Sequence, residues 1–209
     1  MVKIIAGQWK GRRIRTSEGE GYRPAMGRVR EALFSMLTSR GVRWESARVL
    51  DVFAGSGSLG WEALSRGAPE VCFLEKDTRA LRLLREQARL FFSPDQLIRI
   101  LPGDALLVLS RPPKPSSSPR PYGFDVLFFD PPYGRNLLVP AVSLAHRHGW
   151  LAPDALVCAE VEQGWSPAAL DIPDLVLETE RTYGQTRICI WTRISAKNVL
   201  PSIPEPSTP

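Results

Sequence analysis

Residues 49–64 have the sequence VLDVFAGSGSLGWEAL, in which an apolar run passes through a glycine-rich turn into a helical pattern. Glycines at such a turn let the backbone approach a ligand closely, and the N-terminus of the following helix can bind an anion. A bare glycine pattern is also compatible with a purely structural tight turn. The segments that follow along the chain distinguish the two interpretations.

Apolar runs and amphipathic segments alternate after this turn, which predicts a largely parallel sheet covered by helices on both faces. The predicted strands span residues 48–53, 70–75, 97–101, 124–130 and 155–161. The predicted helices span residues 58–66, 78–92, 105–110 and 136–149. Two last strands, 175–182 and 187–192, flank Tyr183-Gly184-Gln185 and predict an antiparallel hairpin. We therefore expect an α/β fold, and the hairpin favours the Rossmann-like methyltransferase variant over a purely parallel dinucleotide-binding sheet.

Length and composition predict one main domain with a small appendage in the 209-residue chain. We expect a basic N-terminal extension at 1–45, the sheet domain at 46–194 and a proline-rich, disordered tail at 195–209. A proline- and serine-rich segment, 111–121, predicts a mobile surface loop. No run is long and apolar enough for a membrane span, and the N-terminus lacks a secretory signal pattern. We therefore expect a soluble, cytoplasmic monomer that does not associate with membranes.

Positive charge is concentrated near the N-terminus. Residues 1–48 contain 11 Lys/Arg and 4 Asp/Glu, whereas the whole chain has a net charge of +5. This segment predicts a strand at 3–8, a strand at 12–15 and a helix at 26–40. A local basic block favours nucleic-acid binding over a merely solvated surface. The candidate RNA-binding residues are Arg12, Arg13, Arg23, Arg28 and Arg30.

The three cysteines, Cys72, Cys158 and Cys189, are far apart and lie in apolar runs. This spacing indicates neither a disulfide framework nor a zinc site. We expect buried, reduced thiols and no bound metal.

Acidic residues follow the next two predicted strands. Glu75 ends the second strand, where a nucleoside ribose would present its hydroxyl groups. Asp104 follows the third strand, where it can hold an adenine amino edge, cap the following helix, or do both. The candidate cofactor-binding residues are Asp51, Phe53, Ala54, Gly55, Ser56, Gly57, Glu75, Lys76, Asp104 and Ala105.

The fourth predicted strand ends at Asp130, Pro131, Pro132 and Tyr133, the candidate catalytic residues. An exocyclic aryl amine is a poor nucleophile because its lone pair is delocalised into the ring. The Asp130 carboxylate and the Pro131 carbonyl can accept both N–H bonds and so orient that lone pair. The two prolines stiffen the turn, and Tyr133 can stack on a base. After a glycine-rich turn and an acidic strand end, this motif favours amine methylation over a turn that only ends a strand.

Several segments, in this order, resemble the bacterial RsmD-type 16S ribosomal RNA guanine-N2 methyltransferases. They are IIAGQWKGRRI at 4–14, RPAMGRVREALF at 23–34, FAGSGSLG at 53–60, EALSRGA at 62–68, LEKD at 74–77, GDA at 103–105 and FDPPYG at 129–134. The resemblance extends from about residue 3 to residue 193. Ala25 and Ser35 depart from it, since the family commonly has Thr and Asn there.

This resemblance implies S-adenosylmethionine (SAM) as methyl donor, S-adenosylhomocysteine as product, and no metal. The implied substrate is a guanine of 16S rRNA within the small ribosomal subunit or its assembly intermediate. The glycine turn would hold the methionine part of SAM, Glu75 its ribose, and Asp104 with Ala105 its adenine. Two alternatives stay open: a DNA adenine-N6 methyltransferase, because the same tetrapeptide serves that chemistry, and a non-catalytic RNA-binding protein on the same fold.

Overall fold

The main sheet of the computed structural model contains seven strands. The structure describes residues 2–16, 24–91, 93–114 and 123–195. The strands are β3 (Arg48–Val52), β4 (Glu70–Glu75), β5 (Leu97–Pro102), β6 (Phe124–Phe129), β7 (Leu151–Glu162), β8 (Leu175–Tyr183) and β9 (Thr186–Arg193). Their order across the sheet is β5-β4-β3-β6-β7-β9-β8. The first five are mutually parallel, whereas β9 runs antiparallel to both β7 and β8. The predicted fold class, including the terminal hairpin, is confirmed.

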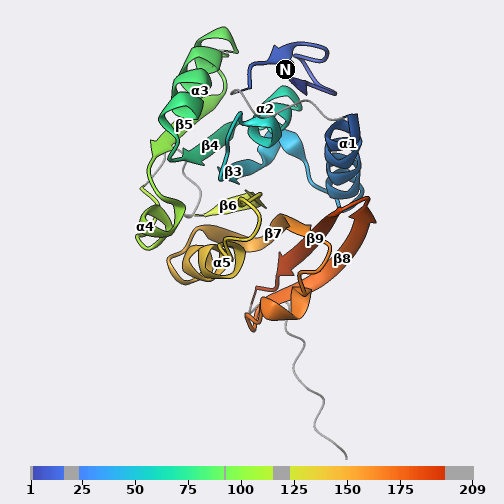
Figure 1. Cartoon of the computed structure of the whole chain (residues 1–209). Coiled ribbons are helices and arrows are strands. Elements are labelled where there is room, and N and C mark those ends of the chain that lie inside the picture. Colours follow the sequence, from blue (N-terminus) through green and yellow to red (C-terminus); the bar gives the residue numbers. More distant parts are fainter. Residues whose placement is uncertain (1, 17–23, 92, 115–122, 196–209) are drawn as a thin grey trace, which may run out of the picture.

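Helices cover both faces of this sheet (Figure 1). They are α1 (Pro24–Ser39), α2 (Ser58–Ser65), α3 (Thr78–Leu90), α4 (Ala105–Leu109) and α5 (Leu138–Arg147), with short 3-10 turns at Trp44–Ser46 and Pro167–Ala169. Side chains of α1, α2 and α3 share one buried core with the sheet, and those of α4 and α5 share another. Burial on both faces explains why β6 is almost continuously apolar.

The N-terminal hairpin is present but shorter than predicted. Its strands are β1 (Val2–Lys3) and β2 (Arg13–Ile14), which pair antiparallel. Beyond β1 the backbone turns to α2, where the Glu62 carboxylate accepts hydrogen bonds from the amides of Ile5 at 2.7 Å and Ala6 at 3.0 Å. These two amides are occupied by a side chain, so the hairpin ladder does not continue through them.

A second set of contacts holds the same segment against the end of α2. Ser65 Oγ accepts from the Trp9 amide at 2.9 Å and donates to the Ala6 carbonyl at 2.6 Å. Gly7 has φ +82°, and a Cβ there would lie 1.7 Å from the Ser65 carbonyl oxygen. Only glycine fits this close approach, so Gly7 allows the N-terminal segment to pack against α2.

Replacing Glu62 with alanine should lower the free energy of unfolding by about 3–5 kcal/mol. Glu62 is fully buried, and its loss would leave the amides of Ile5 and Ala6 and the Arg66 Nε, 2.9 Å from Oε1, without their acceptor. Urea unfolding measures the change. Glu31→Ala on the exposed face of α1 is the control. Equal effects of the two substitutions would show that Glu62 does not hold the N-terminal segment.

Cys72, Cys158 and Cys189 are all buried free thiols, as predicted. Burial raises the pKa of Cys72 to about 12 and that of Cys189 to about 11, so both stay protonated near neutral pH. None of the helices in the described ranges combines the length and apolarity that a bilayer crossing requires. Most of the predicted 111–121 loop and nearly all of the predicted tail lie outside the described residues.

Candidate active site at the carboxyl edge of the sheet

The candidate site lies where the chain changes direction across the sheet. From β3 the chain passes to β4 and β5 on one side and then crosses to β6 on the other side of β3. The loops after β3 and β6 therefore lead to opposite sides of β3, which is the position where open α/β sheets usually bind their ligands. Because β3, β4, β5 and β6 are parallel, the predicted residues that follow them meet at one edge.

The turn after β3 has a backbone that few residues can adopt. Phe53, Gly55 and Gly57 have φ values of 61°, 52° and 75°, all in the left-handed region. A Cβ at Gly57 would also lie within 2.6–2.8 Å of the Leu84, Trp61 and Phe73 side chains. The glycine pattern is therefore required by both backbone conformation and packing. It brings the chain tightly into the start of α2.

Asp51 stabilises the start of the helix that follows this turn. Its side chain is buried, and Oδ2 accepts a hydrogen bond from the Gly60 amide at 2.9 Å. Burial raises the pKa of Asp51 well above its usual range, and the nearby charges of Asp130 and Glu75 add to this shift. Asp51 thus fixes the first turn of α2, directly after the glycine-rich turn.

Glu75 connects the glycine turn to the start of α3. Its Oε2 accepts from the Gly55 amide at 2.7 Å, and its Oε1 accepts from the amides of Lys76 and Asp77, each at 2.7 Å. A carboxylate has about four acceptor positions, so three bonds leave capacity for a ligand hydroxyl. The residue predicted to bind ribose therefore lies between the two loops that a nucleoside would contact.

Asp104 caps α4, as one of its two predicted roles required. Its Oδ1 accepts from the Leu106 amide at 3.0 Å, and its Oδ2 lies 3.4 Å from Lys76 Nζ. Ala105, the first residue of α4, is buried. The half-exposed Asp104 carboxylate and the preceding Gly103 line the end of β5, next to Glu75 on β4.

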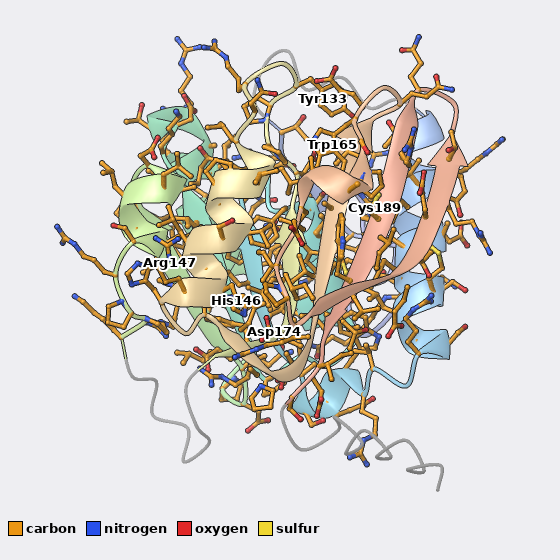
Figure 2. The ribbon with its side chains drawn as sticks, turned by 90° about the horizontal axis from the view of Figure 1, so that it is seen from below. Tyr133, His146, Arg147, Trp165, Asp174 and Cys189 are labelled. Atoms are coloured by element: carbon orange, nitrogen blue, oxygen red, sulfur yellow. The ribbon has the colours of Figure 1, made fainter. Side chains whose placement is uncertain are left out.

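The loop at 130–134 contacts side chains of β7 and β9. Tyr133, which is 52% exposed, places its hydroxyl 3.4 Å from Thr186 Oγ1, and Glu162 Oε1 accepts from the Gly134 amide at 2.6 Å. Pro131 is buried and Asp130 is exposed. Figure 2 shows Tyr133 near Trp165, at the opposite end of the sheet from His146 and Asp174. The loop therefore presents an accessible carboxylate and an aromatic ring from a fixed backbone.

Glu160 on β7 belongs to the same site and was not predicted from the sequence. Phe129 pairs with Ala159, so Asp130 and Glu160 follow at the same level of neighbouring strands. Burial, together with the smaller effect of the Asp130 charge, raises the pKa of Glu160 to about 8, and Arg30 opposes the shift. Glu160 is therefore mainly protonated at neutral pH. The available signal was an acidic residue inside the otherwise apolar run 155–161.

Asp51, Glu75, Asp130 and Glu160 form a carboxylate-rich edge. Within the described ranges, no three or more His, Cys, Asp or Glu side chains are arranged to hold a metal ion. The Asp130 charge raises the pKa of both Asp51 and Glu160, because a nearby negative charge disfavours ionisation. Asp130 is the exposed member of the set.

Glu160→Gln should become more stable relative to the wild type as the pH rises from about 5 to about 8.5. Folding raises the pKa of Glu160, so the unfolded chain ionises first and the native state loses stability over this interval. The variant lacks that loss, so its advantage in free energy of unfolding should grow by about 2–4 kcal/mol. Urea unfolding across the pH range measures it, with the exposed Glu31→Gln reporting the effect of net charge alone. An advantage independent of pH would contradict the protonated state of Glu160.

The structure describes four of the five predicted RNA-binding arginines. Arg12, Arg13 and Arg28 are exposed, and Arg23 lies outside the described residues. Arg30, in contrast, is only 5% exposed, and its Nη2 donates to the Lys3 carbonyl at 2.5 Å, so its role in RNA binding stays a prediction.

Arg30 is buried because it lies on the face of α1 that packs on the sheet. Arg30, Phe34 and Leu37 are spaced by four and three residues, so they lie on one face of α1. Phe34 and Leu37 are fully buried, and that face packs on the sheet. Arg30 therefore links α1 to β1 and faces Glu160 near the candidate site.

Comparison with known proteins agrees with this arrangement. The family model described as conserved hypothetical protein 95 matches residues 2–192. The chain belongs to this family. The match includes the N-terminal segment as well as the sheet. The family that the sequence predicted is therefore confirmed.

Relatives and solved structures extend the comparison. The chain is 39% identical to "Ribosomal RNA small subunit methyltransferase D" of Haemophilus influenzae over 162 residues, covering 78% of this chain and 79% of the relative. It is 35% identical to the protein of that name from Escherichia coli K12, over 77% and 75% of the two chains. A solved structure described as a methylase of H. influenzae superposes with a TM-score of 0.74 at 33% identity, covering 93% and 99% of the two chains. An E. coli structure described as a methyltransferase gives 0.76 at 31% identity, with 93% and 98% covered.

Proposed function

We propose that this protein transfers a methyl group from SAM to the exocyclic N2 amino group of a guanine in 16S rRNA. The observation that carries the proposal is the position of the Asp130–Gly134 loop. Its exposed carboxylate lies at the switch point of the sheet, close enough to Asp51 and Glu160 for its charge to raise the pKa of each. Relatives named as small-subunit rRNA methyltransferases support the choice of RNA.

The cofactor fits the loops that surround this edge. The turn at 53–57 is narrow because of its left-handed residues, and its backbone would hold the methionine part of SAM. Glu75 would accept hydrogen bonds from the ribose hydroxyls with its remaining lone pairs. Asp104 and Ala105 would border the adenine, with Lys76 beside them. When bound, SAM would supply an electrophilic methyl group on its sulfonium.

The protein would make the guanine amine reactive by orienting it. The Asp130 carboxylate and the Pro131 carbonyl accept the two N–H bonds, which points the nitrogen lone pair toward the methyl group. Pro132 restricts the loop, and Tyr133 stacks on the base from a position fixed by Thr186. After transfer, the nitrogen releases a proton to Asp130 or to water.

The protonated Glu160 would assist by leaving Asp130 as the charged acceptor. Two adjacent carboxylates do not both ionise readily, and burial assigns the proton to Glu160 rather than to the exposed Asp130. Asp130 can then act as a hydrogen-bond acceptor at neutral pH. Arg12, Arg13 and Arg28 would bind RNA phosphates, with the enzyme acting as a monomer on the small subunit or its assembly intermediate.

Methyl transfer from labelled SAM to several acceptors tests this proposal. The acceptors are undermethylated small subunits, protein-free 16S rRNA and duplex DNA containing unmodified adenine. We expect label in 16S rRNA from at least one of the two RNA forms and none in DNA. Preferential labelling of DNA would favour an adenine-N6 methyltransferase. RNA binding without any transfer would favour a non-catalytic RNA-binding protein.

A further inference from the structure

The exposed face of α3 carries an unusual amount of positive charge. Its four arginines are all exposed: Arg79, Arg82, Arg85 and Arg89. At 100° per residue these side chains occupy an arc of roughly 120°. The opposite face of the helix is buried and contains Ala80, Leu81, Leu84 and Gln87. The helix therefore presents one face to the core and a continuous basic face to solvent.

Little negative charge within the described parts of the chain offsets this face. Arg79, Arg85 and Arg89 form no ion pair there. Arg82 Nε lies 3.9 Å from Glu86, whose carboxylate is 3.1 Å from Arg15 Nη1. The one acidic residue of α3 is therefore shared between two cations.

The arginine spacing costs stability in the isolated fold. Arg79 and Arg82, Arg82 and Arg85, and Arg85 and Arg89 are three or four residues apart. Like charges at these spacings destabilise a helix. Nothing in the packing of α3 requires guanidinium groups on the solvent side. A polyanionic ligand on this face would remove the repulsion and explain the residue type.

The basic face is continuous with the N-terminal segment at one end. Arg12 Nη1 donates to the Leu90 carbonyl at 3.4 Å, and the Arg12 guanidinium lies 5.5 Å from the Phe91 ring centroid. The amide of Arg15 donates to Gln87 Oε1 at 3.0 Å. Arg12, one of the predicted RNA-binding residues, thus lies against the C-terminal end of α3, and Figure 1 shows this helix beside the N-terminal hairpin.

The other end of α3 borders the candidate active site. The helix begins at Thr78, three residues after Glu75, and Asp77 caps it. Thirteen residues span roughly 20 Å at the α-helical rise. The basic face therefore connects the site at the sheet edge to the exposed arginines of the hairpin.

We propose that this face of α3 binds the phosphate backbone of the RNA substrate over the distance between the active site and the N-terminal hairpin. The inference rests on the proposed function, because it takes the RNA to be the molecule that is methylated. Arginine suits this role since its planar guanidinium forms paired hydrogen bonds to phosphate oxygens. Contacts of this kind set the position of the RNA and carry no sequence information.

Two quadruple variants with the same change in net charge test the proposal. The first replaces Arg79, Arg82, Arg85 and Arg89 with glutamine. The second is the matched control, and it replaces four exposed cations outside α3 and the N-terminal hairpin: Arg111, Lys114, Arg147 and Arg181. Binding of an unmodified 16S rRNA transcript is measured over a range of KCl concentrations. SAM affinity and urea unfolding verify that both variants are folded.

The α3 variant should bind the transcript at least about 10-fold more weakly near 0.1 M salt, with a salt slope reduced by about 2–3. The control should stay within about 3-fold of the wild type, with nearly the wild-type slope. Equal behaviour of the two variants, with a wild type that methylates rRNA, would overturn the role of α3 and leave the proposed function intact. A wild type that neither binds nor methylates rRNA would overturn both. Loss of binding to phosphatidylserine vesicles with unchanged RNA binding would identify a membrane surface instead.

Discussion

Replacing Asp130 with asparagine should lower the single-turnover rate of methyl transfer by about 100- to 1000-fold, with SAM affinity almost unchanged. The substitution keeps the shape of the side chain but replaces one acceptor oxygen with an NH₂ group that faces an N–H donor. It also removes the charge that lies near Asp51 and Glu160. The guanine amine would then lose the acceptor that orients its lone pair.

Two results would contradict this role of Asp130. One is a rate within a few-fold of the wild type. The other is an equal loss in Asp171→Asn, which changes an exposed aspartate outside the candidate site and serves as the matched control. Single-turnover conditions are required because product release could otherwise hide a change in the methyl-transfer step.

Glu75→Gln should weaken SAM binding by about 30- to 150-fold, equivalent to about 2–3 kcal/mol. Glu75 accepts from Gly55 on one oxygen and from Lys76 and Asp77 on the other. The amide nitrogen of glutamine would oppose one set of these donors and would reduce the acceptors left for the ribose. The substitution should therefore disturb both the conformation of the turn and the contact with the ribose.

Isothermal titration with SAM measures this loss, and Glu45→Gln at an exposed position is the control. Wild-type affinity in Glu75→Gln would exclude Glu75 from the cofactor site. A loss of affinity that accompanies global unfolding in the absence of SAM would assign Glu75 to folding rather than to binding.

The sheet and the edge at which its loops meet could be predicted from local patterns. Buried parallel strands such as β6 are almost continuously apolar, and the left-handed turn at Gly55 and Gly57 requires glycine. The capping role considered for Asp104 was also accessible, because an aspartate before a helix is a natural cap. These features depend on neighbours in the sequence, so a sequence pattern records them.

Features that depend on distant partners were not predicted. The hairpin is short because Glu62 accepts from amides 56 and 57 residues earlier. Arg30 is buried because the packed face of α1 includes Phe34, which only the position of the sheet determines. Glu160 joins the site through the strand register between β6 and β7. In each case the side chain is recognisable in the sequence, but its partner is fixed by tertiary structure.

Nucleoside analysis of the methylated RNA tests the central claim most directly. The protein and SAM are incubated with undermethylated small subunits, the 16S rRNA is digested to nucleosides, and the methylated product is identified by mass spectrometry. We predict N2-methylguanosine as the product, absent when Asp130→Asn replaces the wild type. Methylated adenosine, a ribose methylation, or label confined to ribosomal protein would contradict the account.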